Sequence, residues 1–128
     1  AREAGKPLRF ARAEVSRAIV TFELAAAEVR RSRGEVLPLD LEPRGEGPLC
    51  LATRVPRGPV LAITPFNFPL NLVAHKLAPA FAVGASVILK PAPRAPLTAF
   101  LLSDLLDEAG LPGDALSIVP CEPAHAEA

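Results

Sequence analysis

The chain has 128 residues, half of them apolar, enough for the core of one modest globular domain, and its fourteen basic and fourteen acidic residues cancel, which argues against nucleic acid or an anionic membrane as partner. Its longest nearly apolar stretch, 77–89, is about 13 residues and contains Pro79 and Gly84, whereas a membrane-spanning helix needs about 18. Cys50 and Cys121 lack ligand spacing, so we expect no metal site, no disulfide framework and a reducing cytoplasm as location.

The first predicted element is an amphipathic helix from Glu14 to Arg33. Glu14 suits its first turn, because a carboxylate there complements the helix dipole. The apolar positions recur at helical spacing and predict the buried stripe, namely Val15, Ile19, Phe22, Ala26 and Val29. Ahead of this helix, Gly5 and Pro7 read as the stop signal of an earlier one, so we expect further residues before Ala1.

A β-hairpin is expected next. Leucines alternate with other residues over 37–41, a turn-rich stretch follows, and the alternation returns over 49–55. Prolines and exposed polar positions suit edge strands, and a two-stranded arm on an α/β chain often meets another subunit. We therefore assign residues 38–56 to an oligomerisation hairpin and expect a homo-oligomer, a dimer or a tetramer.

The second half predicts three short strands separated by two helices. The strands cover 60–63, 86–89 and 116–119, and their unbroken apolar runs are typical of strands covered on both faces. The helices cover 70–83, where Pro79 should kink or divide the helix, and 96–110. This β-α-β-α-β order predicts an α/β fold with a partial, Rossmann-like parallel sheet, the layout of a nucleotide-binding half-domain.

The loop after the first of these strands carries an unusual pair of amides. Ligands bind such sheets beyond the carboxyl ends of the strands, and there Asn67 stands between two prolines that fix the backbone. Asn67 and Asn71 are the only side-chain amides in the sequence, which suggests that their hydrogen bonds matter. Asparagine also caps helices well, so capping of the following helix and a functional role stay equally open for Asn67.

The loop after the second strand, 90–94, places Lys90 and Arg94 just past a strand end. Two cations at this edge suit a phosphate or a ribose. A solvated turn that happens to contain a lysine is the competing interpretation, and from these residues alone it is the stronger one.

Several ordered motifs resemble the aldehyde dehydrogenase superfamily. Residues 63–70, ITPFNFPL, are similar to its I-T-P-[FW]-N-F-P-L signature, and 86–92, SVILKPA, to its V-[VI]-L-K-P-[SA] strand. Further similarities follow the family's order, at HKLAPA with Gly84, at AGLP, at LSIVP and, upstream, at EAGKP. The signature is closest to lactaldehyde and non-phosphorylating glyceraldehyde-3-phosphate dehydrogenases.

The resemblance implies NAD(P)-dependent oxidation of an aldehyde to an acid through a cysteine thiohemiacetal. Asn67 matches the catalytic asparagine that donates its side-chain N–H to the oxyanion. Lys90 matches the residue that bonds the adenosine ribose, and the other cofactor contacts would be Ile63, Thr64, Pro65, Phe66, Ala92 and Pro93, together with Asn67. Residues 1–37 and 57–128 would then form part of the NAD(P)-binding domain.

The departures from the family are informative. The family's catalytic cysteine and glutamate lie beyond the span of these residues, and neither Cys50 nor Cys121 can replace the thiol, so we expect this chain alone to be inactive. Pro93 stands where NAD-preferring members often carry a glutamate, and Arg94 follows it. NADP should therefore be accepted as well as NAD, because a repulsion against a 2′-phosphate is missing.

The substrate side is implied by the same resemblance. Asn71, Leu72 and His75 would face the substrate tunnel, and His75 replaces a common aromatic, which favours a small hydroxylated or phosphorylated aldehyde. Two alternatives stay open: a stand-alone, non-catalytic module that binds a nucleotide or joins an assembly, and an acylating reductase that uses coenzyme A or an acyl phosphate.

Overall fold

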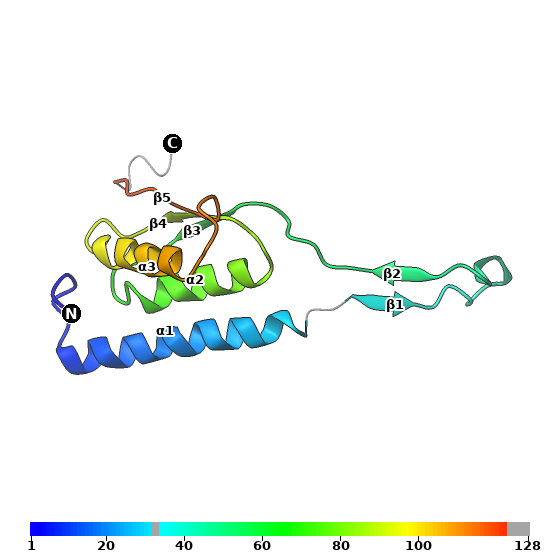
Figure 1. Ribbon diagram of the computed structural model, residues 1–128, viewed down its shortest axis with the longest axis horizontal. Coiled ribbons are helices and arrows are strands. Elements are labelled where there is room, and N and C mark those ends of the chain that lie inside the picture. Colours follow the sequence, from blue (N-terminus) through cyan, green and yellow to red (C-terminus); the bar gives the residue numbers. More distant parts are fainter. Residues whose placement is uncertain (32–33, 123–128) are drawn as a thin grey trace.

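A computed structural model describes residues 1–31 and 34–122. The body combines a long helix, a three-stranded parallel sheet and two crossover helices, and a narrow arm projects far from it (Figure 1). This is the expected α/β architecture. The predicted helix end at Arg33 and the last residues of the predicted cofactor domain, 123–128, lie outside the described residues.

Helix α1 spans Leu8–Val29 and therefore begins six residues before the predicted start. Gly5, with a φ of +58°, reverses the chain, and Pro7 opens the helix with a φ of −54°, which already suits the helical conformation. The buried face also differs from the predicted stripe. Glu14 and Ala18 are buried, whereas Val15 and Ile19 are 46% and 53% exposed, because α1 packs on α2 along a line rotated by one residue.

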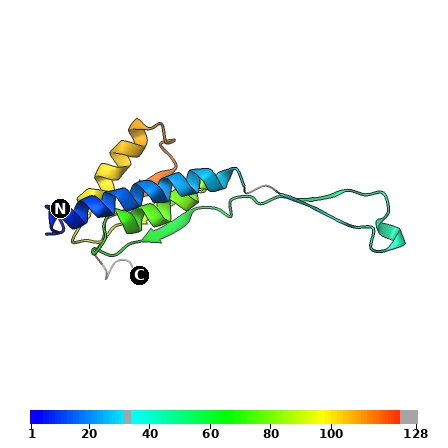
Figure 2. The same cartoon turned by 90° about the horizontal axis from the view of Figure 1, so that it is seen from below.

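The arm is a hairpin of strands β1, Glu35–Leu37, and β2, Cys50–Ala52, paired antiparallel with Leu37 opposite Cys50. A short 3-10 turn, η1, Pro43–Gly45, lies at its tip, away from every helix (Figure 2). Both strands are shorter than predicted, and β1 ends at Leu37, the first residue of the alternating segment that suggested it. Pro38 follows β1 directly and has no N–H to donate to a neighbouring strand.

The sheet contains β3, Val60–Ile63, β4, Val87–Lys90, and β5, Leu116–Ile118, in the order β3-β4-β5 and all parallel. Helix α2, Asn71–Ala82, connects β3 to β4, and α3, Leu97–Glu108, connects β4 to β5. The predicted β-α-β-α-β order is confirmed. Pro79 lies inside α2 without dividing it into the two pieces that were considered possible.

The core lies between the sheet and the crossover helices. Its members include Leu77 of α2, Leu89 of β4 and Ala99 of α3, with Phe22 of α1 packed against them. The other face of the sheet is open in this chain: Leu61 and Ile88 are 65% and 43% exposed. The prediction that both faces are covered is thus wrong for the chain by itself, because both crossover helices and α1 lie on the same side (Figure 1). No helix within the described ranges is long and apolar enough to cross a membrane.

Candidate functional site

Two loops meet at the carboxyl edge of the sheet, as the parallel topology predicted. The amide of Thr64, after β3, donates a hydrogen bond of 3.2 Å to the carbonyl of Lys90, at the end of β4. The Arg94 guanidinium lies 5.4 Å from the centre of the Phe66 ring, so a cation–π contact joins the loops a second time. We call residues 64–70 the Asn67 loop and residues 90–96 the Lys90 loop.

The Asn67 loop presents its polar and apolar groups differently. Thr64 is buried, whereas Pro65 and Asn67 are exposed, and Ile63 and Phe66 are 54% and 51% exposed. Exposed apolar side chains beside an exposed amide at a strand end form a surface on which a flat ring and a polar atom of a ligand can both be bound.

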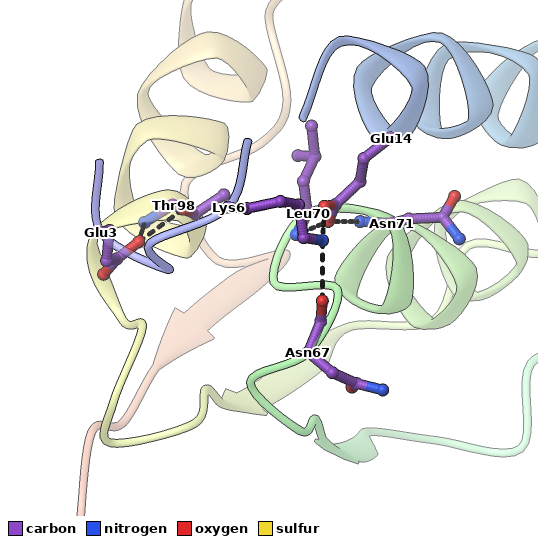
Figure 3. Close-up of polar contacts among 7 residues, drawn as sticks. All are labelled: Glu3, Lys6, Glu14, Asn67, Leu70, Asn71 and Thr98. Atoms are coloured by element: carbon purple, nitrogen blue, oxygen red, sulfur yellow. Dashed lines mark hydrogen bonds and ion pairs between the residues drawn. The ribbon is translucent and has the colours of Figure 1, made fainter. Parts of the chain in front are cut away.

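Asn67 does not cap α2. The helix begins at Asn71, and the capping acceptor is Glu14 of α1, whose Oε1 accepts hydrogen bonds from the amides of Leu70 at 2.9 Å and Asn71 at 3.1 Å. In Figure 3 the Asn67 side chain points away from these amides. The capping interpretation of Asn67 is therefore wrong, and so is the expectation that Glu14 serves the first turn of its own helix, since Glu14 lies six residues after the start of α1.

Lys6 connects this cap to Asn67. Its ammonium donates to Glu14 Oε2 at 2.5 Å and to the backbone carbonyl of Asn67 at 2.7 Å (Figure 3). The same ammonium lies 4.1 Å from the centre of the Phe68 ring. The side chains of Lys6 and Glu14 are only 15% and 5% exposed, so the ion pair is largely withdrawn from water.

The sequence alone suggests no role for Lys6, and for Glu14 it suggests only a place in the first turn of its own helix. The signal in the sequence for Lys6 is the EAGKP motif of residues 3–7, which does not extend to Glu14. A lysine before a proline and a glutamate eight residues later have no local reason to meet. They do so here because the turn at Gly5 brings Lys6 back against α1 and the start of α2.

The electrostatic balance at Glu14 favours the carboxylate. Burial raises the pKa of Glu14, but the hydrogen bond from Lys6, those from the amides of Asn71 and Leu70, and the positive charge of Lys6 outweigh it, so the pKa lies below its ordinary value. Glu14 is therefore ionised at neutral pH and places a negative charge at the positive end of the α2 dipole.

A second glutamate does the same for α3. Glu3 accepts hydrogen bonds from the amides of Leu97 at 2.5 Å and Thr98 at 3.0 Å, and from the Thr98 hydroxyl at 2.5 Å. Pro96, at the N-cap position, provides no side-chain cap. Glu3, ahead of α1, and Glu14, within α1, thus hold the two crossover helices at the ends that face the two loops.

The Lys90 loop keeps its cations accessible. Pro91 and Ala92 are buried, Lys90 is half-buried, and Pro93 and Arg94 are exposed. No hydrogen bond or ion pair engages the Lys90 ammonium within the described ranges. This half-buried ammonium has three donors available and lies near an apolar strand end. Such a placement favours binding of ligand hydroxyls over the alternative of a lysine in a solvated turn.

The three residues predicted to face a substrate tunnel lie at the start of α2. Asn71 is 2% exposed, and its Oδ1 has no hydrogen-bond partner in the described part of the chain. Leu72 is half-buried, and His75 is exposed and lines a groove of about 780 Å³ between α1 and α2. Arg17, which the sequence reasoning missed, shares a smaller adjoining hollow with His75 and lies 5.9 Å from the Phe68 ring centre.

Neither of the two cysteines belongs to the Asn67 loop or the Lys90 loop. Cys50 belongs to β2 on the arm, and Cys121 follows β5 and is half-buried. Within residues 1–31 and 34–122, no group of three potential ligands is placed to hold a metal ion.

Comparison with known proteins shows that the chain is similar to aldehyde dehydrogenases. The model of the aldehyde dehydrogenase family matches residues 1–128. The chain is 47% identical over 119 residues to a 3-sulfolactaldehyde dehydrogenase of Priestia aryabhattai. The aligned residues cover 93% of this chain and 25% of that protein. These relations agree with the expected resemblance.

Solved structures agree in fold. Aldehyde dehydrogenase 21 of Physcomitrella patens, in complex with the reaction product succinate, matches with a TM-score of 0.90 and 48% identity over 98% of this chain and 26% of that chain. The NADP-dependent glyceraldehyde-3-phosphate dehydrogenase of Bacillus halodurans, complexed with NADP, matches with a TM-score of 0.89 and 37% identity over 95% of this chain and 26% of that one. The chain thus spans about a quarter of the length of these relatives.

Proposed function

Because the chain belongs to the aldehyde dehydrogenase family, we propose that it is the segment of an NAD(P)-dependent aldehyde-oxidising enzyme that supplies cofactor contacts and one oxyanion-hole donor. Asn67 is the proposed donor. The observation that carries this role is its placement: an exposed amide at the carboxyl edge of a parallel sheet, free of capping duty, on a loop held by Lys6. Such an amide is available to a reacting carbonyl oxygen.

In the proposed reaction, a cysteine thiolate from outside these residues attacks the aldehyde carbon, and negative charge develops on the oxygen. The Asn67 side-chain N–H donates to that oxygen. A fixed amide donor stabilises the charge because no reorganisation is needed when it forms. Cys50 lies on the arm, and Cys121 follows β5, which β4 separates from the strand that leads to Asn67. We therefore propose that neither supplies the thiolate and that the 128-residue chain alone gives no aldehyde-dependent NAD(P)H. Formation of NAD(P)H by this chain, lost on mutating either cysteine, would contradict the proposal.

The residues of the two loops fit a nicotinamide dinucleotide. The chemistry that the cofactor supplies when bound is acceptance of a hydride. Lys90 would donate to the adenosine ribose hydroxyls, with Ala92 and Pro93 beside it. Ile63, Pro65 and Phe66 would line the cofactor surface, and the buried Thr64 would support it through its backbone bond to Lys90. Arg94, held near the Phe66 ring, adds a cation where a 2′-phosphate would lie, and the B. halodurans relative is NADP-dependent. We therefore propose NADP as well as NAD.

The substrate is proposed to approach between α1 and α2. His75 and Arg17 line the same hollow, close to Phe68, which follows Asn67 directly. Imidazole and guanidinium groups favour an aldehyde with a hydroxyl or an anionic group, the class to which sulfolactaldehyde and glyceraldehyde-3-phosphate belong. Asn71, with its unpaired Oδ1, and Leu72 are proposed to complete the tunnel.

The arm and the open sheet face suggest the rest of the assembly. We propose that residues 38–56 contribute to contacts between subunits of a cytoplasmic homo-oligomer, and that residues 1–37 and 57–128 form part of the cofactor domain. Leu39, Leu41 and Leu49 on the arm are all exposed, as are Leu61 and Ile88 on the sheet. Apolar surface of this extent is uncommon on an isolated soluble domain.

The decisive experiment is Asn67→Ala in the complete enzyme. We expect kcat to fall by about two to three orders of magnitude while cofactor affinity changes by a few-fold at most, because the amide acts in the transition state. Steady-state kinetics and cofactor fluorescence titration measure the two quantities. A wild-type kcat in the folded variant would overturn the assignment.

A further inference from the structure

We infer that Lys6 and Glu14 are positioning residues for Asn67: the buried ion pair, contributed by the N-terminal segment and α1, sets the direction of the oxyanion-hole amide. The inference rests on the proposed role of Asn67. It concerns two residues that touch neither aldehyde nor cofactor in that proposal and act through the backbone of the Asn67 loop.

The first contact is at Asn67 itself. The Lys6 ammonium donates 2.7 Å to the Asn67 carbonyl, so it fixes the plane of the peptide that leaves Asn67. The Asn67 side chain branches from the residue whose carbonyl is held. A rotation of this peptide would swing the amide away from its target, and a misplacement of about 1 Å is enough to cost about 100-fold in rate.

The second contact is at the other end of the same short segment. Glu14 Oε1 accepts from the amides of Leu70 and Asn71, and Glu14 Oε2 accepts from Lys6. The segment between Asn67 and Asn71 is therefore held at both ends by one pair of side chains. Phe68, between the held points, lies 4.1 Å under the ammonium and restricts the loop further.

The pair is also sheltered from competition by water. With side chains 15% and 5% exposed, Lys6 and Glu14 have few solvent partners to exchange with. Charged hydrogen bonds of this kind are shorter and stronger than neutral ones. At a site with little access to water, they favour one conformation of the loop over similar ones. Helix α2 has no capping side chain of its own, so its first turn depends on Glu14.

The chain offers a matched control in Glu3. Glu3 comes from the same N-terminal segment and caps α3 through Leu97 and Thr98, at the same edge of the sheet. Among the residues that the structure describes, the hydrogen bonds of Glu3 join it to Leu97 and Thr98 and none reaches the Asn67 loop. A variant at Glu3 therefore removes a helix cap of the same kind without touching the proposed oxyanion donor.

The test uses the complete enzyme with the double variant Lys6→Met/Glu14→Gln. It removes the contact to the Asn67 carbonyl but leaves no uncompensated buried charge and keeps an amide oxygen as the α2 cap. We expect kcat to fall about 10- to 100-fold with cofactor Kd within a few-fold, whereas Glu3→Gln leaves kcat unchanged. If the double variant does not fold, Glu14→Gln alone is the substitute. It keeps Lys6 but weakens the bond that holds the ammonium, so kcat is again expected to fall.

A general structural role would not make the effects of the double variant and of Asn67→Ala on kcat non-additive, so non-additivity distinguishes the positioning role. In an Asn67→Ala background the double variant should change kcat by less than about three-fold, because the group that the pair positions is already gone. Losses that multiply in full would overturn the positioning role and leave the proposed function intact. A wild-type kcat for Asn67→Ala would overturn the proposed function and this inference with it.

Discussion

The N-termini of α2 and α3 both follow a parallel strand at the same edge of the sheet, and a glutamate from the N-terminal part of the chain caps each. They differ in what else the glutamate holds. Glu14 is buried and paired with Lys6, which reaches the Asn67 loop, whereas Glu3 is half-buried and bonds Thr98. A glutamate cap is therefore linked to the proposed chemistry at α2, whereas at α3 it only secures the helix.

The largest expected difference concerns stability. Glu14→Ala leaves the Lys6 cation without its partner and α2 without a cap, and breaking a largely buried pair costs about 3 kcal/mol or more. Glu3→Ala loses a cap alone, which costs about 1 kcal/mol. Amide hydrogen exchange at Leu70 and Asn71, compared with Leu97 and Thr98, measures the two openings separately. Equal acceleration at both helices would remove the distinction between them.

An intermediate effect is expected at the Lys90 loop. Pro93→Glu places a carboxylate near the proposed 2′-phosphate position and should shift the preference toward NAD by about 1 to 2 kcal/mol, the scale of one charge contact in a partly solvated site. Lys90→Ala should weaken both cofactors. Titration of the complete enzyme with NAD and NADP checks both predictions. The kcat value should stay unchanged, because neither substitution alters Asn67. A strong native preference for NAD, unchanged in Pro93→Glu, would contradict the role of this loop.

The smallest expected effect is on pH dependence. The pKa of Glu14 is lower in the folded chain than its ordinary value. The carboxylate therefore contributes stability that is fully present above that ordinary value and is lost as pH falls through the lowered folded pKa. Denaturant unfolding between neutral pH and pH 3 should show this loss, and Glu14→Gln should reduce it. A Glu14→Gln profile as steep as the native one would show that Glu14 is not its source.

Local patterns in the sequence were sufficient for the elements and for part of the site. The apolar runs of β3, β4 and β5 predicted the crossovers, and the topology then placed Asn67 and Lys90 at one edge of the sheet. Periodicity alone misjudged the buried face of α1. An apolar residue such as Ile19 and a charged one such as Glu14 are sorted by the partner helix, and the partner is not visible in a local pattern.

By itself, the sequence determined the family, the parallel α/β order and the identity of the amide and the lysine proposed for chemistry, because these depend on residue type and on spacing along the chain. Only the tertiary structure decided what holds them. Lys6 and Asn67 are 61 positions apart in the sequence, and Glu14 is 56 and 57 positions from Leu70 and Asn71. Such contacts arise because α1 packs on α2 and the turn at Gly5 folds the N-terminal segment back. A hydrogen bond between distant residues depends on that packing, which no local spacing encodes.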